Sequence, residues 1–487
     1  MTHLNSPHSM SSMQEIRNPA NTAHCLGTIY SATPEQVQQA ITLAATAQPA
    51  WSATSVQERA AVLQRMADLL QQHMTELMSL LIQEAGKTRA DALSEVREAI
   101  DFCRYYAEQA YALMAEQVLP GPTGERNSLQ LHARGLFACI SPWNFPLAIF
   151  LGQIAAALVT GNGVLAKPAP QTPLIAQRTM ALLQAAGLPP PVAALLLGGP
   201  AVGEQLIRDP RIVGIAFTGS TATAKHIARA VLDDAQRPLV TLIAETGGIN
   251  AMIVDSTALP EQVVADVIAS AFQSAGQRCS ALRLLCLQAD IYDTTLRMLT
   301  GAMAELQIGD PMQETTDIGP VIDAAARDRI VKYLDAQASR IHYQLPLPAN
   351  TQQGWFVAPT IIALNTVQEL QQEIFGPVLH VVKWQADKLN ELLDAINASG
   401  YGLTMGVHSR LDSTIQRVRE RARVGNLYVN RSMIGAVVGS QPFGGESLSG
   451  TGPKAGGPHY LLRFCTERTV SIDTTAAGGN ASLLTLD

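Results

Sequence analysis

Apolar and polar positions along the chain follow two patterns, one typical of helices and one typical of buried strands. The first two helices are marked at their starts, because Thr33 with Gln36 and Ser55 with Glu58 have the Ser/Thr–x–x–Glu/Gln spacing of a capping box. Two further helical segments follow, up to about Ala115. The N-terminal part of the chain is therefore predicted to be largely helical.

From about Gly135 onward, short apolar runs alternate with helical patterns. Almost uninterrupted apolar runs are typical of parallel strands that are buried on both faces. These runs predict an α/β fold with a Rossmann-like, doubly wound sheet, and helix–strand units from about Glu261 to Val429 predict a second α/β domain. The runs assigned to the first sheet are LFACIS, GVLAK, VAALLL, IVGIAF and LVTLIA.

Two segments far apart in the sequence alternate between polar and apolar residues, as exposed hairpin strands do: NSLQLHAR at 127–134 and TERTVSIDTT at 466–475. If they pair with each other, they form an arm whose open strand edges need to be covered. We therefore expect this arm to add to a partner copy, in a homodimer or a larger homo-oligomer.

The stretch between Arg134 and Lys167 carries no charge and is long enough to span a membrane. It is interrupted, however, by Pro142, Asn144 and Pro146. Because proline breaks a helix, a strand, a turn, a helix and a second strand explain the stretch better than one spanning helix. No contact with a membrane is expected.

Charge and cysteine content exclude several classes of protein. Lys and Arg number 34 against 41 Asp and Glu, so the chain lacks the basic excess of a nucleic-acid binder. Six cysteines without a CxxC pair, and the lack of an HExxH motif, argue against a disulfide scaffold and against a metal site. The first fourteen residues are polar and contain no Arg or Lys, so they predict a disordered leader rather than a targeting peptide, and the expected compartment is the cytoplasm.

Several residues at turns and strand ends could carry chemistry. Cys279 lies on a turn, where its thiol can be exposed, but an ordinary thiol needs activation because only a few per cent is ionised at neutral pH. Cys286 lies in an apolar strand and is expected to be core. Glu245 ends a strand, where it is either a general base with a raised pKa or a glutamate that faces water. Asn144 could donate to an oxyanion or form an Asx turn, and Gly219 opens a helix that could face a phosphate.

Two other motifs are weaker. Gly86-Lys87-Thr88 looks like the end of a phosphate-binding loop, but that loop needs a glycine where Leu81 stands. The basic run at 417–423 is typical of the solvated C-terminal end of a helix. Neither motif is predicted to be a site.

Over nearly its whole length, from about Asn18, the chain resembles the aldehyde dehydrogenase superfamily. The matching motifs, in the order and spacing of that family, are SPWNFP, LAKPAPQTP, FTGST, ETGG, GQRCS, EIFGPV and QPFGG. The resemblance implies a Rossmann-type NAD-binding domain, an α/β catalytic domain and a β-hairpin oligomerisation arm. The expected divisions are 1–14 for the leader, 15–119 with 136–244 for the NAD-binding domain, 245–455 for the catalytic domain, and 120–135 with 456–487 for the arm and C-terminal tail.

The resemblance implies three catalytic residues. Cys279 would be the nucleophile, Asn144 with the Cys279 N–H would hold the oxyanion, and Glu245 would activate the water that hydrolyses a thioester. It implies NAD as the cofactor and no metal, with NADP left open because Pro170 stands where many NAD-using relatives have glutamate. The cofactor contacts that it implies are Lys167, Thr218, Gly219, Ser220, Glu373 and Phe375.

A closer resemblance is to the glutamate-semialdehyde dehydrogenase module of bacterial bifunctional proline utilization A proteins. It rests on IAETGGINAMIVDSTAL, SAFQSAGQRCSALR, LYVNRSMIGAVVGSQPFGGE and SGTGPKAGGPHYLLRF. It implies oxidation of L-glutamate γ-semialdehyde, which forms from 1-pyrroline-5-carboxylate, to L-glutamate, and a proline dehydrogenase domain or protein as a further partner. The substrate carboxylate would be held by Ser280, Gly435 and Ala436, with Phe145 and Phe443 as aromatic walls.

Two alternatives remain beside this hypothesis. The chain could oxidise another small aldehyde or ω-semialdehyde, or it could be a catalytically silent structural relative. A catalytically silent protein would not need the residues implied for catalysis, and this chain retains Cys279, Glu245 and Asn144. Two positions depart from the family pattern, because Ala224 stands where many relatives have glycine and Ser432 stands where asparagine is expected.

Overall fold

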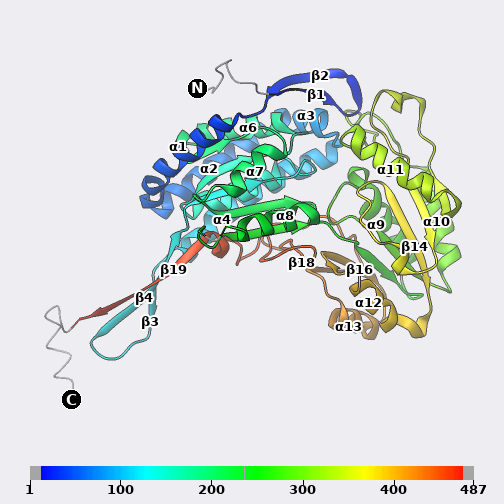
Figure 1. Cartoon of the computed structure of the whole chain (residues 1–487). Helices are drawn as coiled ribbons and strands as arrows, with labels where there is room; N and C mark the ends of the chain where they lie inside the picture. The colour runs from blue at the N-terminus through cyan, green and yellow to red at the C-terminus, as the bar shows by residue number, and fades with distance from the viewer. Residues whose placement is uncertain (1–11, 235, 475–487) are drawn as a thin grey trace.

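The computed structural model describes residues 12–234 and 236–474 of the 487-residue chain. Two α/β domains lie side by side, each built on one sheet, and an arm of antiparallel strands projects from the first domain (Figure 1). This arrangement confirms the predicted α/β fold with a Rossmann-type domain, a second α/β domain and a β-hairpin arm.

The N-terminal helices begin where the sequence predicts. The Thr33 hydroxyl accepts from the Gln36 backbone N–H at 3.3 Å, and the Gln36 side chain accepts from the Thr33 N–H at 2.9 Å. Ser55 and Glu58 form the same reciprocal pair, so both predicted capping boxes are confirmed. The helices of this block are α1 (Pro34–Ala53), α2 (Val56–Gln72), α3 (Met74–Ala85) and α4 (Arg89–Leu113).

The first domain contains a five-stranded parallel sheet in the order β7-β6-β5-β8-β9, and all five predicted strands are present. The chain begins this sheet at β5, adds β6 and β7 on one side, and then crosses over to add β8 and β9 on the other side. The direction in which strands are added therefore reverses between β5 and β8. Ligands bind at such a switch point, outside the carboxyl ends of the strands. The elements are β5 (Leu136–Ile140), α5 (Ala148–Val159), β6 (Gly163–Lys167), α6 (Pro173–Ala185), β7 (Ala193–Leu195), α7 (Pro200–Arg208), β8 (Ile212–Gly219), α8 (Thr221–Leu232) and β9 (Thr241–Thr246).

The second domain contains a seven-stranded sheet in the order β12-β13-β14-β11-β10-β16-β17, in which only β12 is antiparallel to its neighbour. Cys286 lies in β11 and is fully buried, as predicted. The strands are β10 (Ala251–Val254), β11 (Leu284–Gln288), β12 (Ile341–Gln344), β13 (Thr360–Leu364), β14 (Val378–Trp384), β16 (Thr404–His408), β17 (Asn426–Val429) and the separate pair β15 (Tyr401–Gly402) and β18 (Glu446–Ser447). The helices are α9 (Pro260–Phe272), α10 (Tyr292–Ala304), α11 (Ala324–Ala336), α12 (Leu389–Asn397) and α13 (Asp412–Arg421).

The arm consists of β3 (Gln117–Leu119), β4 (Glu125–Ala133) and β19 (Cys465–Asp473) in the order β19-β4-β3. β4 and β19 pair antiparallel over their whole length. The two alternating segments, distant in sequence, therefore pair with each other as predicted. Residue 475, the last of the predicted segment, lies outside the described residues.

The N-terminal boundary differs from the expected one. Residues 13–14, which the sequence assigned to a leader, belong to β1 (Met13–Asn18), which pairs with β2 (Asn21–Tyr30). The pairing satisfies the backbone of this polar segment, and Ile16 is buried beneath it. The leader residues 1–11 lie outside the described residues.

Two further boundaries also shift. The sequence placed residues up to 119 in the NAD-binding domain, but β3 pairs with β4 and belongs to the arm. The segment 456–464, assigned to the arm and tail, packs against the first domain instead, where Tyr460 is buried and the rings of Phe464 and Phe137 lie 4.8 Å apart. Aromatic side chains bury far more apolar surface in that core than on an exposed arm, which explains the difference.

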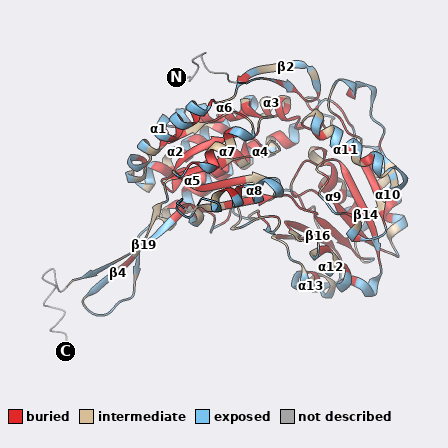
Figure 2. Cartoon of the chain, in the orientation of Figure 1, coloured by how far each residue is buried: buried red, intermediate tan, exposed pale blue. Residues whose placement is uncertain are grey.

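The uncharged stretch between residues 134 and 167 forms β5, α5 and β6 in the interior of the first domain. α5 is buried on all sides, which explains why its sequence is apolar except for Gln153 (Figure 2). Among the described residues, no helix is both long enough and apolar enough to cross a membrane.

Candidate active site

A cavity of about 380 Å³ lies where the carboxyl ends of β8 and β9 meet α4, α5 and two loops of the second domain. Eight of the residues predicted to form the site line this cavity. They are Phe145, Thr218, Glu245, Cys279, Ser280, Gly435, Ala436 and Phe443. The remaining predicted residues lie outside the lining of this cavity: Asn144, Lys167, Gly219, Ser220, Glu373 and Phe375.

Cys279 is held on a loop with an unusual backbone, which we call the Cys279 loop (residues 273–281). α9 ends at Phe272, and Ser274 and Ala275 then adopt left-handed φ angles of 57° and 53°. The Asn250 side chain donates to the carbonyl of Cys279 at 2.6 Å and to that of Ala281 at 2.9 Å. The loop thereby leaves its helix and presents the half-buried Cys279 thiol to the cavity.

The thiol of Cys279 is neutral in this arrangement. Burial raises its pKa to about 12, the carboxylates of Glu373 and Glu245 act in the same direction, and a hydrogen bond from the Ser280 backbone opposes them. A group with this pKa keeps its proton at neutral pH. A reaction of this thiol as a nucleophile would therefore require that its proton be removed.

Glu245 ends β9 and points its carboxylate into the cavity. Its Oε2 accepts from the Gly445 N–H at 3.0 Å, while its buried Oε1 has no hydrogen-bond partner among the described residues. Burial raises the pKa of Glu245 to about 8, against the Gly445 hydrogen bond and the charge of Lys454. The carboxylate fits closely, because a Cβ at Gly450 would approach its Oε2 to 2.7 Å. Of the two readings that the sequence left open for Glu245, the buried carboxyl with a raised pKa fits this geometry and the glutamate that faces water does not.

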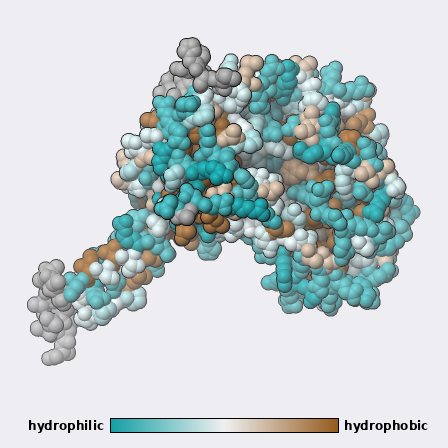
Figure 3. Space-filling view, viewed as in Figure 1, coloured by the Kyte–Doolittle hydropathy of each residue, from teal (hydrophilic) through white to brown (hydrophobic). Residues whose placement is uncertain are grey.

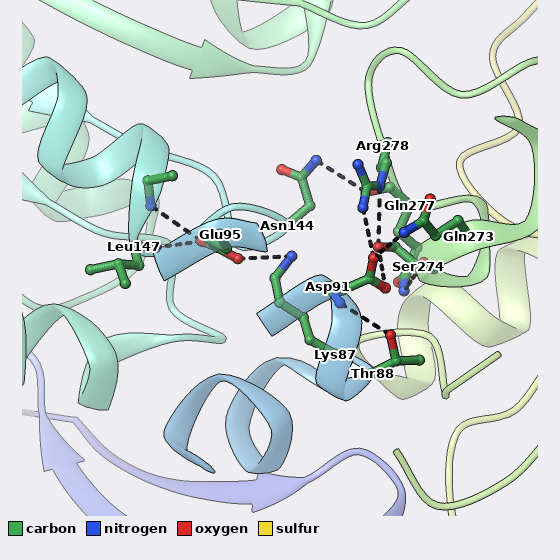
Figure 4. Close-up of polar contacts among 11 residues, drawn as sticks. Lys87, Thr88, Asp91, Glu95, Asn144, Leu147, Gln273, Ser274, Gln277 and Arg278 are labelled. Atoms are coloured by element: carbon green, nitrogen blue, oxygen red, sulfur yellow. Dashed lines mark hydrogen bonds and ion pairs between the residues drawn. The ribbon is translucent and has the colours of Figure 1, made fainter. Parts of the chain in front are cut away.

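Asn144 follows β5 and lies beside the Cys279 loop. Its Nδ2 donates to the carbonyl of Gln277 at 3.1 Å (Figure 4). An amide NH₂ has two donors, and Gln277 takes one of them. The second N–H is therefore available to another acceptor at the edge of this loop.

The predicted anchor residues converge on the same cavity. Ser280 is buried beside Cys279, and the loop with Gly435 and Ala436 faces it. Gly435 has a φ of 82°, a left-handed conformation that favours glycine. Phe443 is fixed by two backbone hydrogen bonds with Ala455, of 2.9 and 2.8 Å. The backbone and hydroxyl donors of an anion site are thus present next to the thiol.

Four of the six predicted cofactor residues, Lys167, Thr218, Gly219 and Ser220, lie at the ends of β6 and β8. Burial lowers the pKa of Lys167 to about 8, and its ammonium group donates to the Pro168 carbonyl at 3.2 Å. No carboxylate of the described residues forms an ion pair with it. Ser220 caps α8 by accepting from the Thr223 N–H at 3.2 Å, and Thr218 accepts from Gln153. A buried ammonium without a counter-charge and a capped helix N-terminus at a Rossmann switch point fit a dinucleotide.

Glu373 and Phe375 lie on the far side of the Cys279 loop. A Glu373 oxygen lies 3.3 Å from the buried Arg283 guanidinium, and burial raises the pKa of Glu373 while Arg283 lowers it. The carboxylate lies directly over Gly247, where a Cβ would be 1.8 Å away. Phe375 packs edge-to-face on Trp143 at 5.5 Å. Neither residue lines the cavity, but the charge of Glu373 acts on the Cys279 thiol.

Sequence reasoning missed the charged face of α4. Glu98 lines the cavity, and burial together with the neighbouring Glu95 raises its pKa to about 7, against the charges of Arg278 and Lys87. Arg278, which could have acted on the neighbouring thiol, forms an ion pair with Asp91 at 2.7 Å instead. The signal in the sequence was the helical spacing of charged residues after Gly86.

Comparisons with known proteins agree with this geometry. The model of the aldehyde dehydrogenase family matches residues 6–470. The bifunctional protein PutA of Escherichia coli is 53% identical over 478 residues, which cover 96% of this chain and 35% of that protein. The 1-pyrroline-5-carboxylate dehydrogenase of Geobacillus thermodenitrificans is 38% identical over 459 residues, 93% of this chain and 89% of that protein.

A solved structure of a 1-pyrroline-5-carboxylate dehydrogenase variant from Thermus thermophilus superimposes with a TM-score of 0.91 at 34% identity, covering 95% of this chain and 90% of that one. The chain thus spans most of the stand-alone dehydrogenases but only 35% of the bifunctional relative. Sequence and structure agree over nearly the whole chain. The protein belongs to the aldehyde dehydrogenase family.

Proposed function

We propose that this chain catalyses the NAD-dependent oxidation of L-glutamate γ-semialdehyde, formed from 1-pyrroline-5-carboxylate, to L-glutamate. The observation that carries this proposal is the convergence of the Cys279 thiol, the Glu245 carboxylate and the Ser280–Gly435–Ala436 anchor on one cavity. Relatives named for 1-pyrroline-5-carboxylate dehydrogenation, at 38% identity over 93% of the chain, support it.

The first step joins the thiol to the aldehyde. A bond forms between the Cys279 sulfur and the carbonyl carbon, the carbonyl electron pair moves to oxygen, and the thiol proton passes to water. The resulting oxyanion of the thiohemiacetal accepts from the Asn144 amide and the Cys279 backbone N–H. A bound NAD would supply the hydride acceptor for this carbon, and loss of the hydride would leave a thioester on Cys279.

The second step hydrolyses the thioester. The Glu245 carboxylate takes a proton from water as the water oxygen bonds to the thioester carbon. The carbon–sulfur bond then breaks, the product leaves as a carboxylate, and the thiol regains a proton. A glutamate with a pKa of about 8 is suited to this task because it binds a proton more tightly than an ordinary carboxylate.

The cavity carries partners for both charges of an amino acid. Ser280 and the N–H groups of Gly435 and Ala436 suit a carboxylate, and Phe145 and Phe443 flank the aliphatic stem. Glu98, on the α4 side of the cavity, is suited to an ammonium group, which would lower the raised pKa of that carboxyl. A semialdehyde with an α-amino acid end therefore fits better than a plain aldehyde.

For the cofactor, the family implies NAD or NADP, and we propose NAD. Lys167 would meet the adenosine ribose, Ser220 and the N-terminus of α8 the pyrophosphate, and Glu373 the nicotinamide ribose, with Phe375 near the nicotinamide. Pro170 supplies no carboxylate that would repel a 2′-phosphate, so the two cofactors are compared directly in the experiment below.

The decisive experiment measures steady-state reduction of NAD and of NADP with a panel of aldehydes. We expect the highest kcat/KM with glutamate γ-semialdehyde and NAD, a lower value with succinate semialdehyde, and the lowest with propanal. A preference for propanal would contradict the proposed substrate, and a preference for NADP would contradict the proposed cofactor.

The chain also has proposed partners. Because the Escherichia coli relative contains this segment as 35% of a longer bifunctional protein, we propose a proline dehydrogenase domain or protein as the source of the substrate. The proposed assembly of the chain itself is a homodimer or a larger homo-oligomer.

A further inference from the structure

We propose that Asp91, on helix α4 of the first domain, is a positioning residue that clamps the Cys279 loop of the second domain. The proposal rests on the proposed chemistry at Cys279. Asp91 itself does not line the cavity and therefore acts through the loop. The clamp sets where the nucleophile lies relative to the oxyanion donor Asn144.

The Asp91 carboxylate binds three side chains of this loop, as Figure 4 shows. Its Oδ1 accepts from the Gln273 amide at 2.8 Å and from the Arg278 guanidinium at 2.7 Å, and its Oδ2 accepts from the Ser274 hydroxyl at 2.8 Å. The carboxylate is 1% exposed. Burial opposes its ionisation, but the charges of Arg278 and Lys87 hold the pKa of Asp91 below its usual value.

The loop needs such a contact because its backbone is unfavourable by itself. Ser274 and Ala275 both adopt left-handed φ angles, which side chains with a Cβ rarely do. Such conformations persist only where surrounding contacts fix them. Asp91 binds side chains before, within and after this turn, at Gln273, at Ser274 and at Arg278, which is the residue next to Cys279.

The same face of α4 holds the second loop of the site. Glu95, one turn after Asp91, accepts at its Oε1 from the backbone N–H groups of Leu147 at 2.8 Å and Ala148 at 3.2 Å, just after Asn144. Its Oε2 pairs with Lys87 at 2.8 Å. Asp91 and Glu95 thus tie the nucleophile loop and the oxyanion loop to one rigid helix (Figure 4).

Two substitutions at Asp91 separate geometry from charge. Asp91→Ala removes every contact with the loop. Asp91→Asn removes the charge, but its amide oxygen can accept from Gln273 and Arg278 while its NH₂ donates to Ser274. A positioning role therefore predicts that the conservative variant restores most of what the alanine variant loses.

Asp209→Ala is the matched control. Asp209 lies in the same domain, is 7% exposed and accepts from Arg211 at 2.7 Å and from Gln38 at 3.2 Å, so it is also a buried carboxylate that binds an arginine and a glutamine. It does not line the cavity. Both alanine variants should lower the Tm, and all rates are compared below the lowest Tm.

We expect Asp91→Ala to lower kcat about 100-fold, because a displacement of about 1 Å at a reacting atom has an effect of this size. The Kd for NAD should stay within about twofold, and Asp91→Asn should recover about tenfold or more of the lost kcat. The Asp209→Ala variant should have the same kcat as the wild type. An equal loss of kcat in Asp91→Ala and Asp209→Ala would contradict the proposed clamp. So would a kcat of Asp91→Asn as low as that of Asp91→Ala.

Hydrogen–deuterium exchange gives a readout that does not depend on activity. Amides of residues 273–281 should exchange faster in Asp91→Ala than in the wild type, and near the wild-type rate in Asp91→Asn and Asp209→Ala. Unchanged exchange in Asp91→Ala would overturn the clamp even in an active enzyme. A wild type inactive on every aldehyde would contradict the proposed function instead, and exchange would still test the clamp.

Discussion

Burial shifts the pKa values of two groups in the same cavity upward, and this governs the order of proton transfers. The Cys279 thiol has a pKa of about 12 and Glu245 a pKa of about 8. At pH 7 the thiol is protonated and about one in ten Glu245 side chains is ionised. Catalysis by both groups should therefore become faster as the pH rises above neutrality.

Cys279→Ala should abolish NADH formation and leave the affinity for NAD nearly unchanged. The thiol acts on the aldehyde and is not among the residues that we propose to hold the dinucleotide. Activity can be followed as NADH absorbance and binding by calorimetry. Turnover near the wild-type rate would contradict the assignment of the nucleophile.

Glu245→Gln should form one equivalent of NADH rapidly and then turn over slowly, because hydrolysis of the thioester lacks its base. In the wild type the ionised, basic form of Glu245 increases as the pH rises through about 8, so the hydrolysis rate should increase between pH 7 and 9. The hydrolysis rate of the Glu245→Gln variant should not show this increase with pH. Rapid-mixing kinetics across this pH range measure both effects, and an equal loss of burst and steady state would place Glu245 elsewhere in the reaction.

Ser280→Ala should lower kcat/KM for glutamate γ-semialdehyde about ten- to a hundred-fold. A charge-assisted hydrogen bond to the substrate carboxylate is worth about 1.5–3 kcal/mol, which corresponds to this range. Propanal, which lacks the carboxylate, is the control substrate because a disturbance of the adjacent Cys279 would slow both substrates. The same fold-change for both aldehydes would argue against the anchor.

At the scale of single elements, the turn between β9 and β10 needs a glycine at position 247. Gly247 lies beneath the Glu373 carboxylate so closely that a Cβ would be 1.8 Å from it. The sequence motif ETGG therefore combines a carboxylate at the strand end with space for a second carboxylate from a distant loop.

Gly247→Ala should raise the KM for NAD about tenfold or more, because it displaces Glu373 and removes a charge-assisted hydrogen bond to the cofactor. Gly301→Ala in α10 is the matched control, since no atom lies within 4 Å of a Cβ built there. Steady-state kinetics with varied NAD compare the two variants. An unchanged KM for NAD in Gly247→Ala would show that Glu373 does not bind the cofactor.

At the scale of the whole molecule, the arm extends away from both domains. Apolar residues gather on it (Figure 3), among them Val118 at 69% and Ile472 at 45% exposure. β3 and β19 are its edge strands, with backbone groups that pair with no neighbouring strand on their outer sides among the described residues. Natural proteins cover such edges.

We therefore expect light scattering at micromolar concentration to give the mass of a dimer or a larger oligomer. The apolar arm and its open edges would otherwise remain in contact with water. A monomeric mass under these conditions would show that the arm is covered in some other way.

The sequence by itself determined the elements and the motif residues. Capping boxes, apolar strands and the order of the motifs depend on neighbouring residues, so Thr33, Ser55 and the five strands of the first sheet lie where they were predicted. The motifs also identified the cavity residues Cys279 and Glu245. Where predictions were wrong, as at Met13 and Tyr460, pairing or packing with a distant segment decided the outcome.

Only the tertiary structure decided how these residues act on one another. Asp91 and Arg278 are 187 residues apart, and no local pattern predicts that they form an ion pair. Glu98 came to line the cavity, and Cys279 and Glu245 acquired their raised pKa values, because folding placed them against particular neighbours. Burial and long-range charge depend on which surfaces meet in space, and the sequence specifies this only through the complete fold.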